Sequence, residues 1–205
     1  MHLLAGLTQI DDMELLMTPK FLSEQFAAGL DYAGYLATGT TEQQRRWTQF
    51  YELASLNDSQ RQLLGGFVRK MHVLVVSGIW CGDCVQQCPL LQRIAEAAPN
   101  VISLKLVDRD VHKELSSQLK INGGDRVPVA IFLAEDFELC GIYGDRTLNR
   151  YRALAAKQLG PSCPIGVVPP DQGDVNATMS DWVGEFERLQ LMLRLSARLR
   201  QKYGD

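Results

Sequence analysis

The sequence has no long apolar run: none of its stretches approaches the roughly 20 apolar residues that span a bilayer. It also has no long basic run, and its formal net charge is −3. Neither a membrane nor a nucleic acid is therefore an expected partner. Residues 1–16 contain two aspartates and no basic segment, unlike a secretory signal peptide. We expect the protein to be cytoplasmic.

Histidine and cysteine are also scarce. The three histidines are too scattered along the chain to give a metal-ligand spacing. Five cysteines do not make the disulfide framework of a small secreted domain, and in a reducing compartment they indicate redox or metal chemistry. The hydrophobic content of 46% and the charged content of 22% are those of a soluble globular protein. The length of 205 residues fits one domain with additions.

The most informative segment is the motif Trp-Cys-Gly-Asp-Cys at residues 80–84. Before it, residues 72–79 form a β-branched run that is typical of a buried strand. After it, residues 85–98 carry apolar side chains at helical spacing. Two cysteines separated by two residues at the start of a helix are placed for dithiol–disulfide exchange, because the backbone N–H groups and the helix dipole favour a thiolate there.

Residues 1–60 are predicted to form a helical lead that packs on the domain after it. Three capping signals indicate where its helices begin: Thr18 before Pro19, Thr40 with Thr41, and Asn57 with Asp58.

Residues 61–160 are predicted to form a domain of strands and helices. Their order predicts an α/β fold, with a βαβ unit followed by a ββα unit, a central mixed sheet and helices on both faces. The expected strands are residues 72–78, 101–108, 127–133 and 137–143, and the expected helices are 83–98, 110–120 and 146–159.

Residues 161–205 are predicted to form a helical extension behind a connector. The connector, residues 160–177, is rich in Pro, Gly and Asp and is expected to be irregular. Residues 178–203 carry apolar side chains at spacings of three and four, interrupted at Ser196. We expect this helix to dock on the domain. Self-association through it and binding of another partner are the alternatives.

The sequence resembles the thioredoxin superfamily in three features: the motif at residues 80–84, Pro89 in the helix that follows, and Val127-Pro128 at the start of a strand. The resemblance covers about residues 60–160. It implies a thioredoxin-like fold in which a cis peptide bond before Pro128 lies opposite the two cysteines.

Within the superfamily, the stretches at residues 107–110 and 122–128 resemble a bacterial thioredoxin-like branch. The sequence departs from ordinary thioredoxin in two places. Asp83 stands where a proline usually separates the cysteines, and Val75 stands where a buried aspartate usually assists the second cysteine. Both departures leave the reduction potential and the proton acceptor open.

In the expected mechanism, Cys81 is the nucleophile, exposed at the helix N-terminus with a lowered pKa. It attacks a substrate disulfide, and Cys84 then attacks the mixed disulfide and releases the reduced substrate. The Asp83 carboxylate opposes the thiolate by about 1 kcal/mol at 4 Å in water, and the helix terminus favours it by roughly 0.3–2 kcal/mol. The pKa of Cys81 therefore stays open. A less stabilised thiolate would favour the disulfide and make the protein a reductant.

A cis bond before Pro128 would turn the main chain of Val127 toward the dithiol, free to pair with an extended substrate strand. Trp80 would offer a partly exposed apolar platform beside Cys81, or would simply pack. The candidate substrate-binding residues are thus Trp80, Gly82, Asp83, Val127 and Pro128.

Cys88 extends the motif to C-x2-C-x3-C-P, which is similar to an iron–sulfur run that lacks one cysteine. Cys140 or Cys163 would have to complete such a cluster. The place of Cys88 inside a helix favours a small buried side chain instead, so we expect no metal and no bound cofactor. Cys140 is expected in the core, and Cys163 is expected to be a passive thiol, with a regulatory disulfide as the alternative.

These patterns predict a thiol–disulfide oxidoreductase, in which Cys81 and Cys84 reduce the disulfides of other proteins. The resemblance implies an electron donor similar to thioredoxin reductase. The alternative is a non-catalytic module of thioredoxin fold that serves in interaction or in redox sensing.

Overall fold

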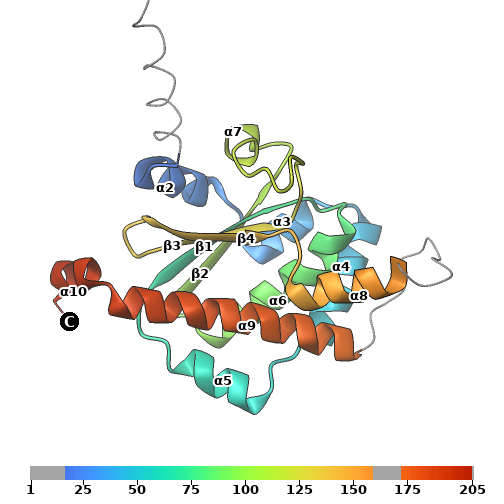
Figure 1. Cartoon of the computed structure of the whole chain (residues 1–205). Coiled ribbons are helices and arrows are strands. Elements are labelled where there is room, and N and C mark those ends of the chain that lie inside the picture. The colour runs from blue at the N-terminus through green and yellow to red at the C-terminus, as the bar shows by residue number, and fades with distance from the viewer. Residues whose placement is uncertain (1–16, 159–171, 205) are drawn as a thin grey trace, which may run out of the picture.

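A computed structural model describes residues 17–158 and 172–204 (Figure 1). Its centre is a four-stranded sheet with the strand order β2-β1-β3-β4. β1 pairs in parallel with β2, whereas β3 pairs antiparallel with both β1 and β4. The mixed sheet expected from the sequence is therefore confirmed. The strands are β1 (Met71–Ser77), β2 (Ile102–Asp108), β3 (Val129–Leu133) and β4 (Leu139–Gly144).

Helices cover the sheet from both sides, as expected. In Figure 1, α5, α6, α8 and α9 lie below the sheet, whereas α2 and α7 lie above it. Within the described residues, no helix is both long enough and apolar enough to cross a membrane. The helices are α2 (Pro19–Ala28), α3 (Tyr32–Ala37), α4 (Thr41–Leu53), α5 (Asp58–Gly65), α6 (Gly82–Ala97), α7 (Lys113–Ser116), α8 (Leu148–Gln158), α9 (Gln172–Leu195) and α10 (Ala197–Tyr203).

The strand β1 lies between two other strands and is buried on both faces, because nearly all its side chains are apolar. Its last residue, Ser77, pairs with Asp108 at the end of β2, and Val76 pairs with Val129 at the start of β3. The end of β1, the end of β2 and the start of β3 therefore meet at one edge of the sheet. The motif cysteines lie just beyond this edge.

The capping signals of the helical lead are confirmed. The side chains of Thr18, Thr40 and Asn57 each accept a hydrogen bond from the backbone N–H three residues on, at the starts of α2, α4 and α5. The lead also contains α3, which the sequence did not predict. With six residues, α3 is too short to show a helical period in the sequence. Asp31 caps it, because its carboxylate accepts a hydrogen bond from Gly34 N–H.

Trp47 joins the lead to the domain. It lies on α4 with no exposed surface, and its Nε1–H donates a hydrogen bond to the carbonyl oxygen of Ile79 at 2.9 Å. Its ring packs against the ring of Tyr35, with centroids 5.6 Å apart. A side chain of the lead thus reaches the loop that precedes Cys81.

Some boundaries differ from those expected. The helix predicted at residues 110–120 is confined to the four residues of α7. The irregular structure predicted for residues 172–177 is wrong, because α9 begins at Gln172 with Asp174 in its first turn, where a carboxylate favours a helix N-terminus. Residues 159–171 of the predicted connector lie outside the described part of the chain.

The predicted docking of the C-terminal helix is confirmed. Trp182, Phe186 and Leu189 of α9 have no exposed surface. The ring of Phe186 meets that of Phe132 on β3, with centroids 5.1 Å apart. The predicted interruption at Ser196 is also present: its hydroxyl accepts a hydrogen bond from Leu199 N–H and caps α10.

An ionic contact holds α10 on the turn between β3 and β4. The carboxylate of Asp136 accepts hydrogen bonds from Arg198 and, at 2.8 Å, from Nζ of Lys202. The hydrogen bond from Arg198 is the main reason why the pKa of Asp136 lies well below its usual range; burial acts against it and Lys202 adds to it.

We expect Asp136→Asn to destabilise the protein in a pH-dependent way. Because the folded-state pKa is lowered, the contact stabilises the fold above the unfolded-state pKa of about 3.9 and loses its effect as the pH falls below that value. The free energy of unfolding, measured with urea, should drop by about 1 kcal/mol at pH 7 and by less at pH 3. Glu138→Gln removes an exposed charge from the same turn and is the control. Equal losses for both variants at both pH values would contradict this account.

Candidate active site

The loop between β1 and α6 places Cys81 at the N-terminus of α6. The backbone N–H of Cys81 donates a hydrogen bond to Gly78 O at 2.9 Å, which closes a turn after the end of β1. Cys81 then takes the capping position of α6 in an extended conformation, with φ −79° and ψ 126°. Its sulfur lies at the terminus where the first backbone N–H groups of a helix have no partner inside the helix.

The two motif cysteines lie at different depths. Cys81 is half-buried, and its Sγ donates a hydrogen bond to Val127 O at 3.6 Å. Cys84 has no exposed surface, and its Sγ accepts a hydrogen bond from Gly78 N–H at 3.4 Å. The side chains of Cys81 and Cys84 interact directly, and both are free thiols in the structure.

The pKa of the Cys81 thiol, which the sequence left open, is raised. The neighbouring Cys84 side chain is the main cause, because two adjacent sulfurs do not both carry a charge, and burial adds to it. The backbone N–H groups of Cys84 and Asp83 act in the opposite direction, as a helix terminus should, but they are outweighed. The sequence also led us to expect an exposed thiol at Cys81. This expectation is wrong, because the thiol is half-buried. Burial raises the pKa of Cys84 well above its ordinary value.

The peptide bond between Val127 and Pro128 is cis, as expected. Gly144 at the end of β4 lies against it: a Cβ at this position would be 2.6 Å from Pro128 O and 3.1 Å from Val129 Cα. Since no side chain fits there, the glycine allows β4 to close over the start of β3. This contact fixes the main chain of Val127 opposite Cys81.

Trp80 is 46% exposed, as expected of a partly exposed platform beside Cys81. One face of its ring lies against Gly78, where a Cβ would be 2.8 Å from the indole. The guanidinium of Arg109 stacks over the ring at 4.7 Å from its centroid, and also donates to Asp125 O at 2.8 Å. The indole is therefore held between Gly78 and the guanidinium of Arg109.

The Asp83 carboxylate is paired with two arginines of the segment around α8. One oxygen lies 2.5 Å from an Arg146 nitrogen, and the other lies 3.4 Å from Nε of Arg150. The three side chains are largely buried, where ion pairs are less screened by solvent than at the surface. We expected Asp83 to oppose the Cys81 thiolate. In the structure the two arginines offset this charge.

Asp145 continues this chain of charges toward Pro128. Its buried carboxylate accepts hydrogen bonds from Tyr151, from Arg146 at 3.1 Å and from Arg126 at 3.3 Å. Burial alone would raise the pKa of Asp145, but the hydrogen bonds from Tyr151 and Arg126 hold it below its usual range. Ion pairs of alternating charge therefore connect α6, the segment between β4 and α8, α8 itself and the loop before β3.

The sequence reasoning missed Arg146, Arg150 and Asp145. The two arginines are four residues apart, a spacing that would place them on one face of the helix predicted at residues 146–159. In the structure α8 begins only at Leu148, so Arg146 precedes the helix. Their partner in the motif, Asp83, is 63 residues before Arg146. Nothing local links the two, so only the tertiary fold reveals the pair.

The other cysteines have separate environments. Cys88 is fully buried, as expected, with Sγ 3.6 Å from Ser77 Oγ. Cys140 is half-buried, not a core residue as expected, because it lies on the edge strand β4. Cys163 lies outside the described residues. Within the described parts of the chain, no three His, Cys, Asp or Glu side chains gather in a way that could hold a metal ion.

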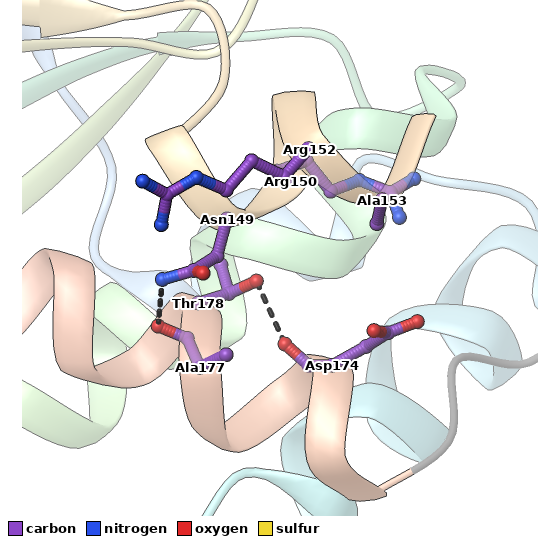
Figure 2. A pocket seen from close by; sticks show the side chains of 7 residues that line it. All are labelled: Asn149, Arg150, Arg152, Ala153, Asp174, Ala177 and Thr178. Atoms are coloured by element: carbon purple, nitrogen blue, oxygen red, sulfur yellow. Dashed lines mark hydrogen bonds between the residues drawn. The ribbon is translucent and has the colours of Figure 1, made fainter. Parts of the chain in front are cut away.

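A pocket of about 190 Å³ lies between α8 and α9 (Figure 2). Two hydrogen bonds join residues that line it: Asn149 donates to Ala177 O at 3.4 Å, and Thr178 donates to Asp174 O at 2.8 Å. Arg150 borders the pocket and reaches Asp83 on its other side.

The family model described as thioredoxin matches residues 29–156, so the chain belongs to the thioredoxin family. Among solved structures, a protein of unknown function from Pseudomonas aeruginosa, PA1234, is 22% identical, with a TM-score of 0.59 over 80% of this chain and 97% of that one. An HIV epitope-scaffold of the 4E10 series is also 22% identical, with a TM-score of 0.54 over 83% and 93% of the two chains. At this identity both show the fold alone. No curated protein matches significantly.

We expect Arg146→Gln to slow the alkylation of Cys81. The change leaves the Asp83 carboxylate with Arg150 alone, so more of its charge opposes the thiolate. About 1 kcal/mol corresponds to a rate with iodoacetamide at pH 7 that is about fivefold lower. Because only the thiolate reacts, the rate rises with pH in both proteins, and the profile of the variant should lie at higher pH. Alkylation is followed by mass spectrometry of the Cys81 peptide.

The double variant Asp83→Asn/Arg146→Gln is the control for this experiment. It removes the carboxylate together with its partner, so the rate should return at least to that of the unmodified protein. A double variant as slow as Arg146→Gln would show that the loss of the arginine acts through packing, and would contradict the electrostatic explanation.

Proposed function

We propose that the protein is a thiol–disulfide oxidoreductase that reduces disulfides of other proteins through Cys81 and Cys84. Membership of the thioredoxin family supports an activity of this kind. The observation that carries the proposal is the position of the dithiol at the N-terminus of α6, with Cys81 Sγ 3.6 Å from Val127 O beside a cis proline.

The reaction follows from the different depths of the two sulfurs. The half-buried Cys81 thiolate attacks one sulfur of the substrate disulfide, and the other substrate sulfur leaves as a thiolate that takes up a proton. Cys84 then forms a bond with Cys81 Sγ, and the bond between Cys81 and the substrate breaks. The proton of Cys84 passes to the leaving substrate thiolate, directly or through water. The substrate gains two electrons, and the protein ends as a disulfide.

The substrate would bind across the main chain of Val127. Pro128 has no N–H to donate, so an extended substrate segment would pair with the Val127 peptide, whose carbonyl oxygen now accepts from Cys81. Trp80, held by Arg109, would supply the apolar surface beside it. Gly82 and Asp83 would border the substrate at the start of α6.

The environment of the thiols favours a reductant. Both pKa values are raised, by the Cys81–Cys84 contact and by burial. Thiolates that are poorly stabilised make the dithiol form less stable relative to the disulfide, and such a pair gives up its electrons readily. This direction suits a reducing cytoplasm, with electrons supplied by a protein similar to thioredoxin reductase.

We expect the protein to accelerate the reduction of insulin by dithiothreitol, measured as turbidity. Cys81→Ser should abolish the acceleration, because the attacking sulfur is gone. Cys140→Ser changes another half-buried thiol, on β4, and should keep full activity. An unmodified protein without activity in this assay would favour the alternative, a module that binds partners or senses redox state without turnover.

A Cys84→Ser variant should trap substrates on Cys81, because nothing remains to resolve the mixed disulfide. Non-reducing gels of the variant with insulin should show an adduct that disappears on reduction. Trapping by Cys81→Ser instead would assign the attack to Cys84 and would contradict the order of steps proposed above.

A further inference from the structure

The ion pairs beside the dithiol join three cations to two anions. Asp83 pairs with Arg146 and Arg150, and Asp145 pairs with Arg146 and Arg126. These five side chains form one ion-pair chain, which runs from Arg150 at one end to Arg126 at the other. Three positive charges face two negative charges in it, so one positive charge is in excess.

Arg126 is the member of the ion-pair chain that a substrate could reach. Its side chain is 39% exposed, against 23% for Arg146 and 13% for Arg150. Among the described residues, Asp145 is its one ion-pair partner, and the contact is made by Nη1 at 3.3 Å. The same carboxylate oxygen also accepts from Arg146 at 3.1 Å. Since a guanidinium has five N–H donors, Arg126 retains donors for a further anion.

The acidic side chains of the neighbouring loops have partners of their own. Asp110 pairs with Arg109, and Asp125 pairs with Lys120. The carboxylate of Asp108, at the end of β2, accepts hydrogen bonds from two backbone N–H groups of the turn that follows it. The excess charge of the ion-pair chain is therefore not taken up by these loops.

Buried groups hold the guanidinium of Arg126 in place. Its partner Asp145 is almost fully buried. The carbonyl oxygen of Asp145 accepts a hydrogen bond at 2.9 Å from Nε2 of Gln87, a residue of α6 with no exposed surface. A long side chain that is already positioned loses less conformational freedom when it binds a ligand. Arg126 is thus prepared for an anion, whereas a lysine on a mobile loop is not.

Arg126 also lies next to the place where the attacked disulfide must lie. It directly precedes Val127, whose carbonyl oxygen is 3.6 Å from Sγ of Cys81. Val127 is buried, whereas Arg126 reaches the surface. Residues that face each other on paired strands have Cβ atoms about 5 Å apart. A substrate segment that pairs with the main chain of Val127 would therefore bring a neighbour of its cysteine to Arg126.

We propose that Arg126 selects substrates that carry an acidic side chain within two residues of the attacked cysteine. The substrate carboxylate accepts hydrogen bonds from N–H groups of Arg126 that Asp145 does not use, and it supplies the anion that the ion-pair chain lacks. A basic side chain at the same place is repelled, which adds to the selectivity. The inference rests on the proposed function and names the class of substrate for it.

The test uses the reduced full-length protein with Cys140→Ser and Cys163→Ser, and three peptides with one cysteine each. The residues on both sides of this cysteine are Glu, Gln or Lys, and its sulfur is joined to thionitrobenzoate in a mixed disulfide. Cys81 attacks the peptide sulfur, and thionitrobenzoate leaves as a coloured thiolate. Each rate is divided by the rate of the same peptide with dithiothreitol, which removes differences in intrinsic reactivity.

We expect the corrected rate to be about fivefold higher for the Glu peptide than for the Gln peptide, and lowest for the Lys peptide. In Arg126→Gln the three corrected rates should become equal. Arg126→Lys should keep at least half of the preference, because the charge is still present. Lys113→Gln is the control for net charge: it removes an exposed cation from α7 and should keep the full preference. Because the peptides are compared within one protein, a general loss of activity cancels.

A salt series on the protein with Arg126 intact gives a second measurement, which does not depend on the folding of any variant. The preference for the Glu peptide should fall as the salt concentration rises to about 1 M, where the Debye length is about 3 Å. A preference that does not depend on salt would overturn the inference, as would one that survives Arg126→Gln or equal corrected rates in the protein with Arg126 intact. Failure of Cys81 to react with all three peptides would instead contradict the proposed function.

Discussion

Asp83 introduces a negative charge inside the motif, directly before Cys84, and the structure around it is arranged to offset that charge. Arg146 lies 2.5 Å from the carboxylate and also contacts Asp145, which in turn holds Arg126 close to Pro128. Without these cations, the Asp83 carboxylate would oppose ionisation of Cys81. Through these ion pairs, the charge of Asp83 is connected to α8, to the end of β4 and to the segment that carries the cis proline.

The other influences on the sulfurs are their contact with each other and their burial. The contact with Cys84, together with burial, raises the pKa of Cys81, and burial raises the pKa of Cys84, so both thiols hold their protons more tightly than in water. The arginines offset the charge of Asp83, so the raised pKa values of the two thiols come from the contact between them and from burial. The backbone N–H of Gly78 is a donor that lies close to the sulfur of Cys84.

The sequence predicted the parts of this arrangement that depend on short-range patterns. The strand before Cys81, the helix after it and the caps at Thr18, Thr40 and Asn57 are all local signals, and all are present. The cis bond at Pro128 followed from family resemblance. The burial of Cys81 and the neutralisation of Asp83 could not be predicted, because both depend on residues that the fold brings in from dozens of positions away.

The hydrogen bond from Trp47 to the carbonyl oxygen of Ile79 has a consequence for how the chain can be divided. A shortened form starting near residue 61 would keep every strand and the whole motif, yet the loop that carries Cys81 would lose the indole that fixes it. The smallest unit with an intact redox centre therefore includes α3 and α4, and engineering or transplanting this dithiol would require moving these helices with it.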